Sequence, residues 1–73
     1  MLRILFNGNE VAMVNTNHSM TLEEAIYIGL GIDVNSQEDC KKSYENGDEF
    51  AYLDDCGFYH IDTEAMDIEG VEV

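Results

Sequence analysis

The sequence predicts a single α+β domain over residues 1–73, in which helices pack on a small antiparallel sheet built from two β-hairpins. Three observations lead to this prediction. Asn7-Gly8 stands between two apolar runs, which is a strong short signal for a hairpin. Thr21-Leu22-Glu23-Glu24 has the form of a helix capping box, and a second alternating stretch surrounds Cys56-Gly57. The expected order is therefore two strands, one main helix, one short helix, two strands and a short final strand.

The first hairpin is expected over residues 2–14. Asn7-Gly8 suits a type I′ turn, because both of its central positions need a positive φ. This two-residue loop pairs Phe6 with Asn9, Ile4 with Val11, and Leu2 with Met13. The register places on one face the side chains of Leu2, Ile4, Phe6, Val11 and Met13, and on the other face Arg3, Leu5, Glu10 and Ala12.

Two helices are expected next. The main helix follows Thr21, ends near Gly31, and has one apolar stripe made of Leu22, Ala25, Ile26, Gly29 and Leu30. The short helix is expected from Gln37 to Glu45, with Asn35 or Ser36 as its N-cap and Asn46-Gly47 at its end. Its inward residues are predicted to be Cys40 and Tyr44, which are four positions apart.

The second hairpin is expected to pair residues 49–53 with residues 58–62. If Cys56-Gly57 is a two-residue loop, one face carries Phe50, Tyr52, Tyr59 and Ile61, and the other carries Ala51, Leu53, Asp55, Phe58, His60 and Asp62. A three-residue loop would change this facing, and the sequence leaves both registers open. A final strand with a bulge at Gly70 is indicated by Met66, Ile68, Val71 and Val73.

The charge is the unusual property of this chain. Sixteen acidic residues against three Lys and Arg give a net charge of −13. No Lys or Arg occurs from residue 44 to residue 73, where the acids are Glu45, Asp48, Glu49, Asp54, Asp55, Asp62, Glu64, Asp67, Glu69 and Glu72. They alternate with apolar residues, so the stretch is predicted to be folded, with carboxylates on the solvent side of a sheet.

Length and composition narrow the function classes. A 73-residue chain has a small core and little room for a deep catalytic pocket. Asn7-Gly8-Asn9-Glu10 interrupts the first apolar run too early for a secretory signal, and no segment is long and apolar enough to span a membrane. Cys40 and Cys56 are too few for a disulfide framework, so we expect a cytoplasmic protein with reduced thiols.

Two patterns resemble metal sites incompletely. Asp33-x-Asn35-x-Gln37 resembles the opening of a calcium loop, but the sixth position is Glu38 and the twelfth is Tyr44. Zinc ligands would have to come from Cys40, Cys56, His60 and His18, which lack the paired short spacings of structural zinc sites. We therefore expect neither a metal nor another cofactor.

Catalytic groups are not indicated either. A nucleophile pair of Cys56 and His60 lacks an orienting group and an oxyanion donor. Adjacent carboxylates such as Asp54-Asp55 are expected by chance in so acidic a chain, and catalytic acids need distinct environments. No catalytic residue is assigned, and the protein is expected not to be an enzyme.

The negative charge of the chain indicates which class of partner it can bind. Aromatic side chains on a sheet bind single-stranded nucleic acid only beside a basic groove, which three basic residues cannot supply. The ten carboxylates of residues 44–73, spread along a domain about 30 Å wide, would be spaced about 3 Å apart. Duplex DNA carries one charge per about 1.7 Å. A basic groove that binds phosphates would therefore also attract this protein.

In size, acidity and the alternation of apolar and acidic residues over 44–73, the chain resembles the small phage-encoded inhibitors that imitate DNA, the anti-restriction and anti-CRISPR proteins. The resemblance implies a non-enzymatic inhibitor in the host cytoplasm. Its partner would be a basic nucleic-acid-binding protein or ribonucleoprotein complex of host defence, with no direct contact to nucleic acid or membrane. The inhibitor would act as a monomer or homodimer.

The expected partner-binding residues combine phosphate-like charges with aromatic anchors: Asp48, Glu49, Tyr52, Asp54, Asp55, Phe58, Tyr59, Asp62, Glu64 and Asp67. Two other functions stay open. A small structural or adaptor protein could self-associate through an apolar sheet face, and an ion-binding module would depend on a metal for folding.

Overall fold

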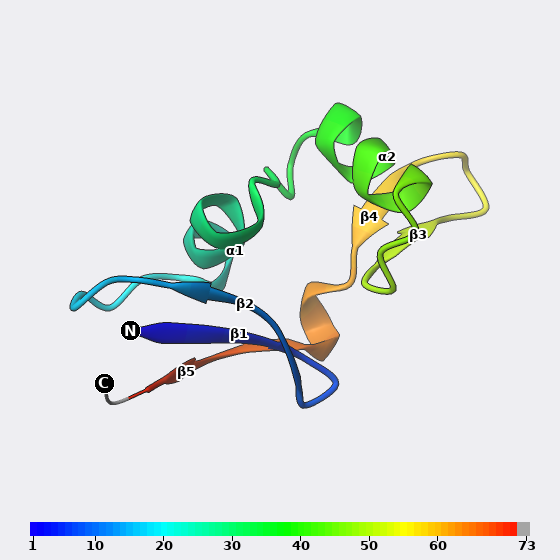
Figure 1. Cartoon of the computed structure of the whole chain (residues 1–73). Coiled ribbons are helices and arrows are strands. Elements are labelled where there is room, and N and C mark those ends of the chain that lie inside the picture. The colour runs from blue at the N-terminus through cyan, green and yellow to red at the C-terminus, as the bar shows by residue number, and fades with distance from the viewer. Residues whose placement is uncertain (72–73) are drawn as a thin grey trace.

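The Asn7-Gly8 turn joins strand β1 (Leu2–Phe6) to strand β2 (Asn9–Val14), and both turn residues have the predicted positive φ, 50° and 82°. This hairpin opens the computed structural model, which describes residues 1–71 (Figure 1). Strand β5 (Met66–Gly70) pairs antiparallel with the other edge of β1, so the strand order is β2-β1-β5. The first and last strands of the chain therefore lie side by side.

A bulge changes the facing of β2. Phe6 is opposite Asn9 as predicted, but Ile4 is opposite Ala12 rather than Val11, because the register shifts between Ile4 and Leu5. One extra residue moves every later side chain to the other face of the strand. Ala12 therefore packs against the core and Val14 is buried, whereas Met13 is 41% exposed. The predictions that Met13 faces the core and Ala12 faces away from it were wrong.

Helix α1 (Leu22–Leu30) lies across one face of this sheet (Figure 1). Its predicted caps are confirmed: Thr21 Oγ1 accepts from the N–H of Glu24, and Gly31 closes the helix with φ 71°. Ala25 and Ile26 are buried on its predicted stripe. A Cβ at Gly29 would lie 2.9 Å from Cδ1 of Ile4, so glycine allows the helix to approach the sheet closely.

Helix α2 (Gln37–Glu45) begins after Ser36, whose hydroxyl accepts from the N–H of Asp39. Cys40 is fully buried, as predicted. Tyr44 is exposed, and the prediction that it faces inward was wrong. Ser43 is buried in its place, and its hydroxyl donates to Asp48 Oδ2 at 2.7 Å.

Strands β3 (Ala51–Leu53) and β4 (Tyr59–Ile61) form the second hairpin. Asp54 and Phe58 close it through a backbone hydrogen bond of 2.9 Å, so the loop has three residues. Ala51 and Ile61 are consequently the buried pair, while Tyr52 lies opposite His60. The facing expected for a two-residue loop was wrong, and the three-residue alternative is confirmed.

The connection back to the first sheet is a single 3₁₀ turn, η1 (Thr63–Ala65), followed by β5. Met66 is buried, and β5 pairs with β1 in unbroken register from Met66 opposite Phe6 to Gly70 opposite Leu2. The predicted bulge at Gly70 is therefore wrong. The part of that prediction concerning Val73 lies outside the described residues.

The molecule has two lobes, and its dimensions are 41 × 20 × 19 Å. We call β1, β2, β5 and α1 the sheet lobe, and α2, β3 and β4 the hairpin lobe (Figure 1). The α+β class and the order of elements are confirmed, but the two hairpins belong to two sheets rather than one. The lobes meet where the ring of Phe6 contacts the ring of Phe50, with centroids 6.0 Å apart. None of the helices in residues 1–71 has the length and apolarity needed to cross a bilayer.

Candidate partner-binding site

An open cleft of about 570 Å³ lies between the two lobes. We call it the carboxylate cleft, because its lining includes Glu23, Asp62 and Glu64. Glu23 comes from the first turn of α1, whereas Asp62 is the N-cap residue of η1 and Glu64 lies within η1. The remaining polar lining consists of Asn35, Tyr52, His60 and Thr63. Three of the predicted binding residues, Tyr52, Asp62 and Glu64, are thereby brought together.

The wall of the cleft formed by the hairpin lobe is held by stacked rings. The rings of Tyr52 and His60, which are cross-strand partners, stack with centroids 5.1 Å apart and an interplanar angle of 27°. His60 Nε2 lies 2.6 Å from Asp54 Oδ2, so the imidazole is held by a stacking contact on its face and by a polar contact at its edge. A ring fixed in this way presents a defined surface to a partner at little further cost in conformational entropy.

Asp54 organises the hairpin loop rather than facing solvent freely. Its Oδ1 accepts from the N–H groups of Cys56 and Phe58, at 2.8 and 2.9 Å. The side-chain hydrogen bond from His60 and the backbone N–H of Phe58 lower the pKa of Asp54 below its ordinary value. Three donors converging on one carboxylate favour its charged form. Asp54 therefore has a structural role in the loop in addition to its charge.

The loop is also tied to α2. Gln37 Nε2 donates to the carbonyl of Tyr59 at 2.7 Å, and the N–H of Tyr59 donates to Gln37 Oε1 at 2.8 Å. The two bonds join the first turn of α2 to β4, which fixes the hairpin relative to the helix. The ring of Tyr59 is half-buried against Tyr44, with centroids 5.4 Å apart. Tyr59 is therefore partly a packing residue.

The other predicted binding residues are dispersed. Glu49, Asp55 and Phe58 are exposed, with Asp55 in the β3–β4 loop and Glu49 before β3. Asp48 is half-buried and lies in a separate hollow that also contains Lys42. Asp67 is exposed on β5 at a position alternate to the buried Met66, so it faces away from α1.

The carboxylate cleft also contains Glu23, Asn35 and His60, which are not among the predicted binding residues. The sequence indicates Glu23 only as part of the capping box, and Asn35 only as a cap or calcium-loop residue. The sequence indicates His60 only as an incomplete zinc ligand or a partner of Cys56, whereas in the structure its side chain contacts the carboxylate of Asp54. No local pattern places α1 next to η1, so Glu23 and Glu64 could not be paired from spacing.

The basic residues lie elsewhere. Arg3 is on β1, between Glu10 at 3.7 Å and Glu69 at 3.6 Å. Lys42 pairs with Glu38 along α2 at 3.6 Å. Within residues 1–71, no Lys or Arg lines the carboxylate cleft. The potential in the cleft is therefore negative, and nothing in the described chain neutralises it locally.

Within residues 1–71, the thiols and the two incomplete metal patterns form no further site. Burial raises the pKa of the Cys40 thiol, while Cys56 is exposed in the hairpin loop. Asp33 Oδ1 accepts from the N–H of Asn35, and Asp39 Oδ2 accepts from the N–H of Asp33, so both acids brace the entry to α2. Across the described part of the chain, no three His, Cys, Asp or Glu side chains are grouped closely enough to hold a metal ion.

Comparisons with known proteins give no relative for this arrangement: the chain matches no protein-family model, no curated protein and no solved structure.

Proposed function

We propose that this protein is a non-enzymatic inhibitor that binds a basic, nucleic-acid-binding surface of a host defence protein or ribonucleoprotein complex and blocks it sterically. The observation that carries the proposal is the carboxylate cleft. Glu23, Asp62 and Glu64 line a cleft between two lobes, with no Lys or Arg in its lining among the described residues. A concave surface of one charge sign attracts an oppositely charged partner and speeds the encounter.

Charge density supports nucleic acid as the ligand that is imitated. A net charge of −13 along a molecule 41 Å long is one charge per about 3 Å. Duplex DNA carries one charge per about 1.7 Å, and one of its turns is about 34–36 Å long. The protein therefore offers about half the charge of DNA over slightly more than one helical turn. A groove that binds one turn of duplex can accept such a body.

The hairpin lobe supplies contacts other than charge. Tyr52 and Phe58 are about half exposed, and Tyr52 is fixed by its stack on His60. Rigid aromatic residues beside carboxylates are suited to anchor a protein interface. In this proposal the acids steer and orient the partner, while the aromatic rings contribute to the lifetime of the complex.

The experiment is capture followed by competition. The immobilised protein is incubated with bacterial lysate at low and high salt, and captured proteins are identified. Nucleic acid bound to each purified partner is then challenged with the free inhibitor. We expect a basic partner whose capture falls steeply with salt and whose nucleic acid is released. Capture that does not depend on salt, or a partner that keeps its nucleic acid, would contradict the proposal.

Two variants with equal net charge make this experiment specific. The cleft variant carries Glu23→Gln, Asp62→Asn and Glu64→Gln. The outer-face variant carries Glu10→Gln, Asp67→Asn and Glu69→Gln, on the side of the sheet opposite α1. Binding that is lost in the cleft variant and kept in the outer-face variant assigns the function to the cleft rather than to overall charge.

Self-association through the hairpin lobe is a second candidate function, because Tyr44, Leu53 and Phe58 are exposed there. Such a structural or adaptor protein would bury these side chains against a second copy. Sedimentation equilibrium distinguishes the two functions. A stable dimer that the double substitution Leu53→Ser and Phe58→Ser converts to monomer, without any basic partner, would favour this function.

A further inference from the structure

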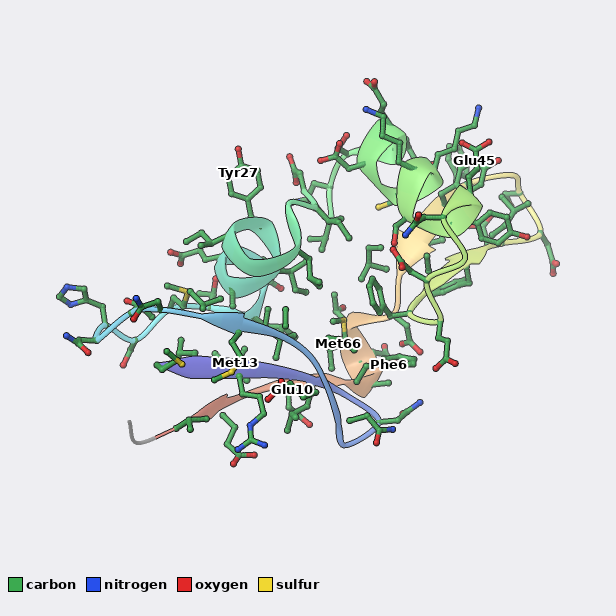
Figure 2. All side chains as sticks on the ribbon, in the orientation of Figure 1. Phe6, Glu10, Met13, Tyr27, Glu45 and Met66 are labelled. Atoms are coloured by element: carbon green, nitrogen blue, oxygen red, sulfur yellow. The ribbon has the colours of Figure 1, made fainter. Side chains whose placement is uncertain are left out.

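The outer face of α1 and the loop after it form a second groove, of about 480 Å³, which we call the Tyr27 groove. Its lining combines three apolar side chains, Tyr27, Ile28 and Val34, which we call the apolar floor, with three acids, Glu23, Glu24 and Asp33, which we call the acidic rim. Figure 2 shows Tyr27 extending from α1 away from the sheet. Tyr27 and Ile28 are 62% and 59% exposed, more than the other large hydrophobic residues that the structure describes.

The packing of α1 on the sheet does not require Tyr27 and Ile28 to be apolar. The buried stripe of α1 is complete with Leu22, Ala25, Ile26, Gly29 and Leu30, and Tyr27 and Ile28 fall outside it. Adjacent large apolar side chains exposed over a hollow indicate an interaction surface more often than isolated ones do. The acidic rim then limits what can cover them, because a purely apolar partner would remove carboxylates from water without pairing them.

We propose that the Tyr27 groove binds arginine side chains of the basic partner. This inference rests on the proposed function and names the contact that anchors it. The aliphatic stem of an arginine would lie on Ile28 and Val34, and its planar guanidinium would stack on the ring of Tyr27. Its N–H groups would then donate to the rim carboxylates of Glu23 or Asp33. An arginine side chain matches this lining because it combines an aliphatic stem, a planar cation that stacks on an aromatic ring, and several N–H donors.

A second copy of this chain does not fit the groove on the same grounds. Its surface is acidic, with a net charge of −13. Its single arginine, Arg3, is held between Glu10 and Glu69, and its lysines are confined to α2. Docking a copy would place like charges against the acidic rim.

The Tyr27 groove continues into the carboxylate cleft, because Glu23, Val34 and Asn35 line both. A basic segment can therefore run from α1 to β4 along one acidic track. In this arrangement the groove holds an anchoring arginine, and the cleft holds the charges that follow it. The two parts contribute differently: the groove depends on apolar contact, and the cleft depends on charge.

The test uses an oligoarginine peptide as the probe, with an oligolysine peptide of the same length for comparison. Amide resonances of the protein are followed by NMR during titration. The groove variant carries Tyr27→Ser and Ile28→Ser, and the control variant carries Met13→Ser, which removes an exposed apolar residue from β2. All three proteins have the same charge, and all substitutions are at exposed positions, so the fold should be retained.

We expect the oligoarginine shifts to concentrate at residues 23–28 and 33–35, and oligoarginine to bind more tightly than oligolysine. The groove variant should bind oligoarginine about tenfold more weakly, the loss expected from one cation–π contact with its apolar floor. The control variant should bind like the wild-type protein.

Equal binding by the groove variant and the wild-type protein, or shifts confined to β3 and β4, would overturn this inference. If the groove variant binds like the wild-type protein but the cleft variant with Glu23→Gln, Asp62→Asn and Glu64→Gln no longer binds the captured partner, the proposed function stands without the arginine anchor. If the groove variant and the cleft variant both bind like the wild-type protein, both proposals fail. Shifts at residues 23–35 that grow with protein concentration in the absence of peptide would also overturn it, because they would assign the groove to a second copy.

Discussion

The two lobes are stabilised in different ways. The sheet lobe buries Ile4, Phe6, Val14, Ile26 and Met66 between a three-stranded sheet and α1. The hairpin lobe has two three-residue strands and buries Cys40, Phe50, Ala51 and Ile61. It adds polar contacts, which include those of Gln37 with the backbone of Tyr59 and of Asp54 with its own loop. The acidic residues of this protein are therefore not all free surface charges. Carboxylates of the hairpin lobe such as Asp48 and Asp54 are part of its framework.

The largest effect should come from the core of the sheet lobe. Ile26→Ala removes a fully buried side chain from between α1 and the sheet, and should lower the free energy of unfolding by about 2–5 kcal/mol. A 73-residue domain has about 4–11 kcal/mol in total, so the variant should be close to unfolded. Urea denaturation measures the change.

The matched control is Ile28→Ala, two positions along the same helix. Ile28 is 59% exposed, so its removal should change stability by less than about 0.5 kcal/mol. Equal losses from both substitutions would show that α1 packs on the sheet through a different face.

A smaller effect is expected from the contact between α2 and the hairpin. Gln37→Ala removes both hydrogen bonds to Tyr59 and should lower stability by about 1–2 kcal/mol. Amide hydrogen exchange should accelerate in α2, β3 and β4 while β1 and β5 stay protected, because the hairpin lobe opens locally. Lys41→Ala, at an exposed position of the same helix, is the control. Uniform acceleration in both lobes would contradict separate stabilisation of the hairpin lobe.

The smallest effect is expected from Asp54→Asn, on the pH dependence of stability. Because hydrogen bonds lower the pKa of Asp54, its stabilising contribution is present above the pKa of the unfolded chain and is lost as pH falls through the folded value. Asp54→Asn keeps an acceptor oxygen but removes the charge. The difference in urea midpoint between wild type and Asp54→Asn should shrink as the pH falls below about 4.

Asp55→Asn removes the same charge from the same loop without touching these bonds, so it should follow the wild-type midpoint at each pH. A difference for Asp54→Asn that stays unchanged in acid would show that its carboxylate does not organise the loop.

Local interactions explain which parts of the fold could be predicted. The Asn7-Gly8 turn, the Thr21 and Ser36 caps and the Gly31 end depend on neighbouring residues, and all are where the sequence placed them. The bulge opposite Ile4 and Leu5 was missed because Met13 and Val14 are both apolar, so neither register is penalised by composition. Separation into two sheets is a tertiary outcome, and no local pattern encodes it.

The candidate site follows the same division. Tyr52, Asp62 and Glu64 belong to one acidic stretch of the sequence, and they line one cleft. Glu23 and Asn35 join them only through the packing of α1, which is not local information. The exposure of Tyr27 and Ile28 could have been predicted, since both are apolar residues outside the helical stripe.

We infer that the position of the acids, rather than their number, determines binding. The most direct measurement is release of nucleic acid from the captured partner by the wild-type protein, the cleft variant and the outer-face variant. All three are compared at one low salt concentration. We expect the wild-type protein and the outer-face variant to release nucleic acid at the same concentration. The cleft variant should require at least about tenfold more, as expected for loss of interface charge pairs. Equal potency of the two variants would contradict it.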